Sequence, residues 1–178
     1  MNEGIVHGVP KKQCIFKNGD VVSVDVGLFF NGFHTDTSIT VGLNPSDEIK
    51  NFLTVGKKAL KESINEAVVG NYIFDVSKRI QNIIADANYQ VIMALVGHGI
   101  GKSLHEEPQI PCFVQGKRES TPLIKEGLVM AIEVMYTLGK PEVKLEDDKW
   151  TIATRDGKIS ALYEDTVAVT AKGPIVIT

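Results

Sequence analysis

The sequence contains few cysteines, no excess of basic residues and no long uninterrupted apolar segment. Its two cysteines, Cys14 and Cys112, lack the spacing of a metal-binding pair, which predicts free thiols in a reducing compartment. The formal net charge of −3 at pH 7 excludes the basic surface that nucleic-acid-binding proteins usually carry. We therefore expect no direct contact with nucleic acid.

The apolar segments are too short for a membrane protein. The longest, residues 128–138, is interrupted by Glu133 and cannot span a bilayer. The first residues, Met-Asn-Glu-Gly, lack the apolar stretch of a signal peptide. We expect a cytoplasmic protein without membrane contact, and the length of 178 residues predicts one domain that covers residues 1–178.

Residues 20–37 contain the clearest local signal in the chain. Residues 21–30 and 37–41 are rich in β-formers, and Asn31-Gly32 between them is typical of a type I′ hairpin turn. The predicted register pairs Phe30 with Phe33, Gly27 with Asp36, and Asp25 with Ser38. Asp25 and Asp36 would then lie diagonally on one face, roughly 7 Å apart at the backbone. Such a carboxylate pair favours a shared proton or a bound cation, the alternative being two solvated surface acids.

Two amphipathic helices are expected after the hairpin. Apolar residues recur at the helical period from Asp47 to about Val68, and Gly70-Asn71 would end this helix. A second apolar stripe runs from Asp75 to Tyr89. Neither segment carries an evident reactive group, so we expect both helices to cover a sheet.

The second half of the chain places polar residues beside predicted strands. Residues 91–96 are expected to form a short buried strand that leads into a glycine-rich loop with His98 and His105. The glycines would let the backbone approach a ligand. Residues 128–136 form an apolar strand around Glu133, which must be paired, protonated or bound to a cation, a buried salt bridge being the plain alternative.

A last hairpin is expected from residues 150–154 and 159–170, with a charged loop over residues 141–149 before it. Its second strand contains Glu164 and Asp165. Collected together, the candidate ligands are four carboxylates and one imidazole: Asp25, Asp36, His98, Glu133 and Glu164. Two divalent cations bridged by carboxylates would resolve the repulsion among these acids. Oxygen ligands with a single histidine suit Mn²⁺, Fe²⁺ or Co²⁺.

Six segments, in this order, resemble the type I methionine aminopeptidases. They are Val-His-Gly-Val-Pro at 6–10, Val-Asp-Val-Gly at 24–27, Gly-Phe-His-Thr-Asp-Thr at 32–37, Gly-His-Gly-Ile-Gly with Leu-His-Glu-Glu-Pro within 97–108, Ala-Ile-Glu at 131–133 and Ala-Leu-Tyr-Glu-Asp-Thr at 161–166. The resemblance covers essentially the whole chain. It implies the α+β pita-bread fold, an antiparallel sheet covered by helices, and removal of N-terminal methionine.

The resemblance also implies roles for particular residues. The metal ligands would be Asp25, Asp36, His98, Glu133 and Glu164, with Asp36 and Glu164 bridging two ions. A bridging water would attack the first peptide carbonyl, and Glu133 would accept its proton. His105 would contact the substrate carbonyl, His7 would lie near the scissile nitrogen, and Trp150 would line the methionine pocket. His34 has no role in the family and is expected to be structural.

The chain also departs from the family pattern. Family members carry an N-terminal segment before the Val-His-Gly motif, so the resemblance implies an N-terminally truncated fold. Val134 stands where a proline is usual, and Asp165 where many members have histidine. The expected partner is the N-terminal methionine of peptides or nascent chains, met near the ribosome by a monomeric enzyme. The alternatives are an Xaa-Pro aminopeptidase or prolidase and a non-catalytic binding module of the same fold.

Overall fold

The hairpin predicted around Asn31 and Gly32 is confirmed. The computed structural model describes residues 1–178, and both turn residues have positive φ angles, 53° for Asn31 and 89° for Gly32, as a type I′ turn requires. Strands β2 (Val21–Phe30) and β3 (Phe33–Gly42) pair along their whole length in the predicted register. The local turn therefore decides which side chains of the hairpin share a face.

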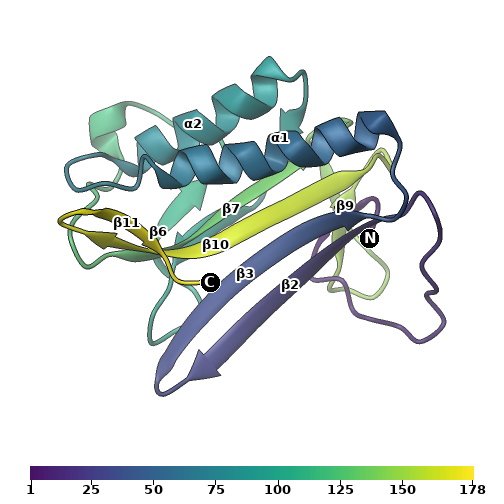
Figure 1. The fold of residues 1–178 in the computed structure, drawn as a ribbon, viewed down its shortest axis with the longest axis horizontal. Coiled ribbons are helices and arrows are strands. Elements are labelled where there is room, and N and C mark those ends of the chain that lie inside the picture. Colours follow the sequence, from purple (N-terminus) through teal and green to yellow (C-terminus); the bar gives the residue numbers. More distant parts are fainter.

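The hairpin forms one edge of an eight-stranded antiparallel sheet (Figure 1). Along the main path the order is β2, β3, β10, β7, β5 and β6, while β4 pairs with β7 and β11 with β10. These further strands are β4 (Gln90–Val91), β5 (Val96–Gly99), β6 (Glu106–Pro111), β7 (Val129–Thr137), β10 (Ser160–Thr170) and β11 (Gly173–Val176). The pairing of β3 with β10 brings the beginning and the end of the chain side by side.

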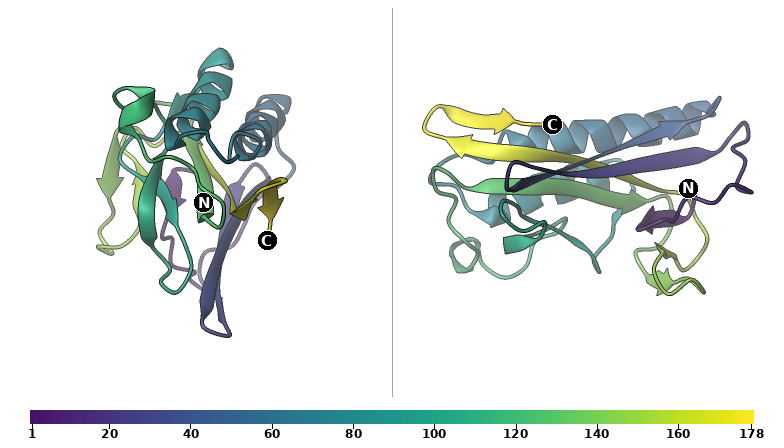
Figure 2. Two further views of the ribbon diagram at one scale, coloured as in Figure 1. Left: turned by 90° about the vertical axis from the view of Figure 1, so that its left-hand side faces the viewer. Right: turned by 90° about the horizontal axis from the view of Figure 1, so that it is seen from below.

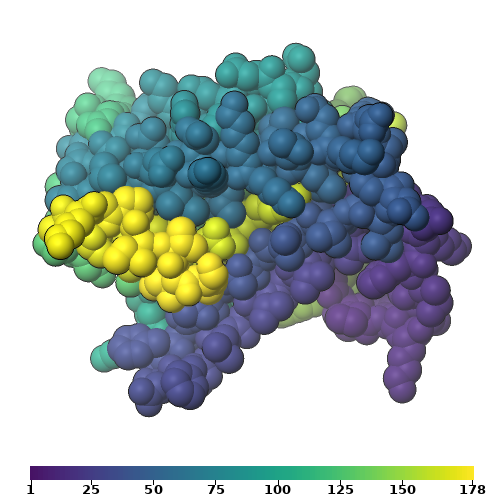
Figure 3. Space-filling model, in the orientation of Figure 1, coloured from purple at the N-terminus to yellow at the C-terminus, as the bar shows by residue number.

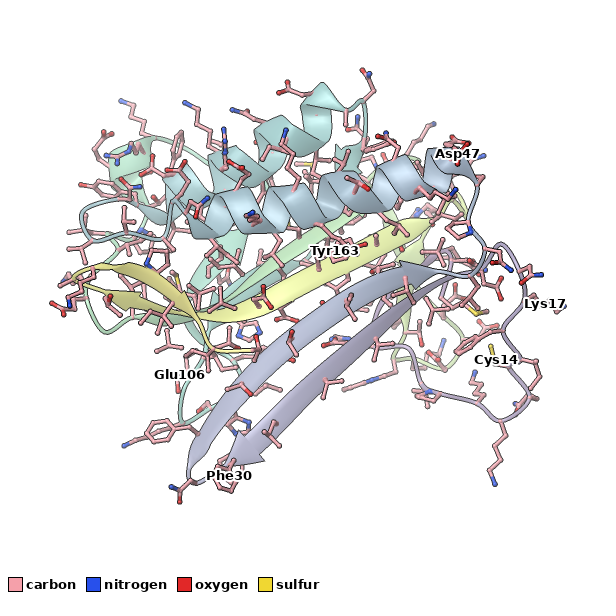
Figure 4. All side chains as sticks on the ribbon, viewed as in Figure 1. Cys14, Lys17, Phe30, Asp47, Glu106 and Tyr163 are labelled. Atoms are coloured by element: carbon pink, nitrogen blue, oxygen red, sulfur yellow. The ribbon has the colours of Figure 1, made fainter.

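Two helices cover β7 and β10 on one face of the sheet (Figure 1). They are α1 (Asp47–Ile64) and α2 (Ile73–Asp86), so the first ends before the predicted Val68. Ser46 caps α1, because its side chain accepts a hydrogen bond from the Ile49 amide. Figure 4 shows Tyr163 on β10 beneath α1. Neither helix combines the length and the apolar character that crossing a membrane requires.

The same face of the sheet is uncovered over the hairpin. Seven apolar side chains share this face by register and are exposed: Val24, Val26, Leu28, Phe30, Phe33, Ile39 and Val41. The hairpin extends away from the helices in Figure 2, and its tip projects from the body in Figure 3. We call these seven residues the apolar strip. It is larger than the isolated apolar residues that most surfaces expose.

Two of the predicted elements are wrong. Residues 91–96 do not form one strand: β4 ends at Val91, β5 begins at Val96, and His98 lies within β5 rather than in a loop. The last hairpin does not form either, because β9 (Ile152–Thr154) does not pair with β10. Instead β1 (Gly4–Val6), β9 and β8 (Val143–Leu145) make a separate three-stranded sheet, and β8 lies in the stretch expected to be a loop. Pairing between strands that are far apart in the chain leaves little sign in the local sequence.

A short 3₁₀ turn, η1 (Arg118–Ser120), completes the elements. Both cysteines are free; Cys112 is buried beside β7, whereas Cys14 lies exposed on the N-terminal loop (Figure 4). Burial raises the pKa of the Cys112 thiol to about 12. This agrees with the expectation of unpaired thiols.

Candidate metal centre

Four polar residues form a row across the middle of the sheet. Asp25 on β2 lies opposite Ser38 on β3, Ser38 lies opposite Glu164 on β10, and Glu164 lies opposite Glu133 on β7. Directly opposed residues of antiparallel strands point to the same face. The sheet therefore gathers three carboxylates that are far apart in sequence on the face opposite the helices.

Asp36 and His98 both lie in the neighbouring row, on the same side of the first one. Asp36 is two positions from Ser38 on β3, and His98 on β5 lies opposite Ala131, two positions from Glu133. Ligand atoms of Asp36, His98 and Glu164 all lie within 4.8 Å of one another. The five residues predicted as metal ligands therefore converge on one place, from five strands.

His98 is oriented for a ligand at its outer nitrogen. His98 is 6% exposed, and its Nδ1 lies 2.9 Å from the Gly99 carbonyl oxygen. With the N–H at Nδ1 donating to that oxygen, Nε2 keeps its lone pair and faces Oε1 of Glu133 at 3.5 Å. Burial lowers the pKa of His98, so the ring is neutral at physiological pH, as a metal ligand must be.

Without a cation, the carboxylates of this cluster repel one another. Burial, the charge of Asp36 and a hydrogen bond with it together raise the pKa of Asp25 to about 6. Burial and the charges of Asp25 and Asp36 also raise the pKa values of Glu133 and Glu164. Like charges this close hold protons or attract a cation.

The side chains of the cluster fit divalent cations. Four carboxylates and one neutral imidazole are the hard donors that Mn²⁺, Fe²⁺ and Co²⁺ accept. In the centre of the row, the Ser38 hydroxyl is buried and has no hydrogen-bond partner in the protein. A buried orphan hydroxyl beside a carboxylate cluster indicates that a further polar group completes the site.

The glycines around His98 have a different purpose from the one the sequence suggested. A Cβ on Gly97 would come 2.6 Å from the Ala131 carbonyl oxygen, and one on Gly99 would come 2.2 Å from the Glu107 carbonyl oxygen. The glycines thus let β5 lie tightly between β6 and β7. They make room for neighbouring backbone rather than for a ligand.

The remaining candidates lie at the edge of the cluster or away from it. His105 is exposed, and its ring packs against the His98 ring with centroids 4.4 Å apart. Its loop is held by Glu106 (labelled in Figure 4), whose Oε1 accepts from the Ser103 amide at 2.8 Å. His34 is half-buried and stacks on Phe29 at 4.6 Å, outside the ligand cluster.

His7 and Trp150 form a separate exposed pair. Their ring centroids lie 5.4 Å apart, and the Thr151 hydroxyl donates to the His7 carbonyl oxygen at 3.3 Å. His7 has a positive φ of 61°, which sets its side chain at the end of β1. The structure thus brings these two predicted substrate contacts together near the small sheet.

Sequence reasoning missed two polar residues of the cluster, Ser38 and Thr166. The hairpin register already places Ser38 opposite Asp25, so the Asn-Gly turn carried the signal for it. Thr166 bonds to the backbone of Asp36 through its hydroxyl. That contact depends on the non-local pairing of β3 with β10, for which the sequence has no local sign.

Comparison with known proteins gives one consistent family. Residues 1–171 match metallopeptidase family M24. The methionine aminopeptidase of Clostridium perfringens is 39% identical over the whole chain, which spans 71% of that protein, and that of Aquifex aeolicus is 37% identical, with 69% spanned.

Solved structures agree with the sequence relatives. Methionine aminopeptidase from Thermotoga maritima superposes with a TM-score of 0.94 at 36% identity, over 98% of this chain and 70% of that one. The expected α+β pita-bread fold is therefore confirmed. A prolidase from Pyrococcus furiosus, at 22% identity and a TM-score of 0.70 over 90% of this chain and 41% of that one, shares the fold alone.

Proposed function

Because the chain belongs to metallopeptidase family M24, and within it to the methionine aminopeptidases, we propose that it hydrolyses the first peptide bond of chains that begin with methionine. The observation that carries this proposal is the row of Asp25, Glu164 and Glu133 across the sheet, with Asp36 and His98 beside it. Residues 1–178 would act as one catalytic domain.

We infer that Asp25, Asp36, His98, Glu133 and Glu164 would hold two divalent cations, and that the carboxylates of Asp36 and Glu164 would serve both. The mutual repulsion of the carboxyls and the lone pair at Nε2 of His98 support this assignment. When bound, such ions lower the pKa of a water molecule and polarise a substrate carbonyl. Mn²⁺, Fe²⁺ and Co²⁺ are the proposed ions, on the ligand types.

Glu133 is the proposed proton acceptor of the reaction. It is nearly buried, and burial with the charges of Asp25 and Asp36 raises its pKa above that of an ordinary glutamate. That raised pKa belongs to the metal-free protein, and the role of base is proposed because the Glu133 carboxylate lies in the ligand cluster, opposite Glu164. The proton would pass to a carboxylate oxygen of Glu133 and then to the departing amine.

His105 and His7 are proposed to contact the substrate. His105 is exposed beside His98, a position that supports hydrogen bonding from its ring to the carbonyl oxygen of the scissile bond. His7 would donate to the nitrogen of that bond. Trp150, stacked near His7, would pack against the methionine side chain.

Two alternatives remain open to the same assay. Cleavage before proline rests on likeness of fold to the Pyrococcus furiosus prolidase. A non-catalytic binding module would be favoured by the loss of metal ligands, and all five are present. We further propose a cytoplasmic monomer that acts on nascent chains near the ribosome, since that is where N-terminal methionine is first available.

A peptide assay tests the proposal. Metal-stripped protein supplied with Mn²⁺ or Co²⁺ is expected to release free methionine from Met-Ala-Ser peptides, measured by mass spectrometry. His98→Ala and Glu133→Ala are expected to abolish the release. Preferred cleavage of Xaa-Pro peptides would instead identify a prolidase. Binding of Mn²⁺ without hydrolysis of either peptide would identify a non-catalytic module.

A further inference from the structure

Strands β3 and β10 are adjacent at the centre of the cluster, and their pairing there departs from a regular antiparallel ladder. Their backbones form one ladder pair, Ser38 opposite Glu164. Two positions to either side, the register sets Thr40 opposite Leu162 and Asp36 opposite Thr166. At both places a threonine hydroxyl, rather than the backbone of the threonine, makes the hydrogen bonds to the opposite strand.

The hydrogen bonds to the opposing backbone follow the same pattern at both places, although the Thr40 hydroxyl also contacts the Ser23 hydroxyl at 2.8 Å. The Thr40 hydroxyl donates to the Leu162 carbonyl oxygen at 2.6 Å and accepts from the Leu162 amide at 2.9 Å. The Thr166 hydroxyl donates to the Asp36 carbonyl oxygen at 2.7 Å and accepts from the Asp36 amide at 2.8 Å. In a regular antiparallel pair the two backbones would exchange these bonds directly.

The two threonines differ in the residue whose backbone they bind. Thr40 binds the backbone of Leu162, which is not among the proposed metal ligands. Thr166 holds Asp36, whose carboxylate lies in the ligand cluster with Glu164. The backbone of Thr166 bonds elsewhere, because its amide donates to the Thr178 hydroxyl and its carbonyl oxygen accepts from the Ile177 amide. The link from β10 to the Asp36 backbone therefore passes through the Thr166 hydroxyl.

Resting on the proposed function, we propose that Thr166 is a positioning residue of the metal centre. Its hydroxyl sets the position of Asp36 on β3 relative to Glu164, two residues away on β10. Metal–ligand distances in well-formed sites lie within about 0.2 Å of their standard values, so the position of a ligand carboxylate matters. Thr166 is fully buried, so no bulk water replaces the hydroxyl when it is removed, and the Asp36 amide and carbonyl must seek new partners by moving.

Calorimetric titration of Mn²⁺ into metal-stripped protein tests this role. Thr166→Val keeps the shape of the side chain and removes the hydroxyl, and we expect about 10- to 100-fold weaker Mn²⁺ binding, as for other groups that orient ligands. Thr166→Ser keeps the hydroxyl and is expected to restore the affinity. Thr40→Val breaks the equivalent bridge to Leu162 and is the matched control, expected to lower the melting temperature but leave Mn²⁺ affinity unchanged.

The outcomes separate positioning from general stability. Unchanged Mn²⁺ affinity in Thr166→Val, or an equal loss in Thr40→Val, would overturn the positioning role while leaving the proposed metal centre intact. If Thr166→Val does not fold, Thr166→Ala, which places no methyl groups against the Asp36 backbone, is compared with Thr166→Ser in the same titration. Failure of the unmodified protein to bind Mn²⁺ would instead overturn the proposed function, and this role with it.

Discussion

At the scale of single residues, the candidate site depends on carboxylates in positions that are unfavourable without a cation. Glu133 and Glu164 face each other across two central strands, and burial raises both pKa values. The sequence points to the five proposed ligands because each stands in a distinctive local motif. Ser38 and Thr166 escaped sequence reasoning because hydroxyl groups are common in strands and their importance depends on which strand lies beside them.

Glu133→Gln tests two separate effects of the Glu133 carboxyl, one on turnover and one on the stability of the metal-free protein. The amide cannot accept the proton, so turnover is expected to fall by at least about 100-fold. The same change removes a buried negative charge next to Asp25 and Asp36, so the metal-free protein is expected to melt at a higher temperature than the unmodified protein at pH 8.

Peptide turnover and thermal unfolding of the metal-free variant measure these two effects. Glu119→Gln in the exposed turn η1 is the control, because it removes an acid of the same type far from the cluster and should change neither quantity. A Glu133→Gln variant that melts at a lower temperature without metal would show that Glu133 is held by a favourable structural contact instead.

At the scale of elements, local signals predicted the β2–β3 hairpin and both helices, whereas non-local pairing was missed. The Asn31-Gly32 turn gave the β2–β3 register in full, because the turn and the strands it joins are contiguous. The position of β9 could not be predicted in this way, since it pairs with β1 and β8 rather than with β10. The helix α1 followed from its apolar period and its serine cap, and only its end differed.

The prediction at the scale of elements concerns the apolar strip of the hairpin. Exposed apolar side chains on a flat strand pair bind fluorescent apolar dyes such as ANS, so we expect enhanced dye fluorescence with the folded protein. Replacing Val26 and Leu28 with threonine should reduce the signal while preserving β propensity. Leu145→Thr, which changes a similarly exposed residue on β8 outside the strip, is the control. An equal reduction by both sets of changes would contradict a dye site on the hairpin.

At the scale of the whole molecule, the cluster couples stability to pH and to metal. Glu133 and Glu164 keep protons in the metal-free folded state at pH values where the unfolded chain has released them. The folded state then binds more protons than the unfolded state, so the free energy of unfolding falls as the pH rises above about 4, the ordinary carboxyl pKa. The pKa values of His98 and the Met1 amine are lowered, so these two groups make the free energy of unfolding rise with pH, through smaller shifts.

Thermal unfolding with and without Mn²⁺ tests the gathering of these acids most directly. Between pH 6.5 and pH 8.5 the melting temperature of the metal-stripped protein is expected to fall, because the folded state still holds protons on Glu133 and Glu164 that the unfolded chain has already released. Saturating Mn²⁺ is expected to raise the melting temperature, and most at pH 8.5, because the cation binds the folded, deprotonated cluster. A melting temperature that does not fall over this range and does not respond to Mn²⁺ would contradict a dication centre in this sheet.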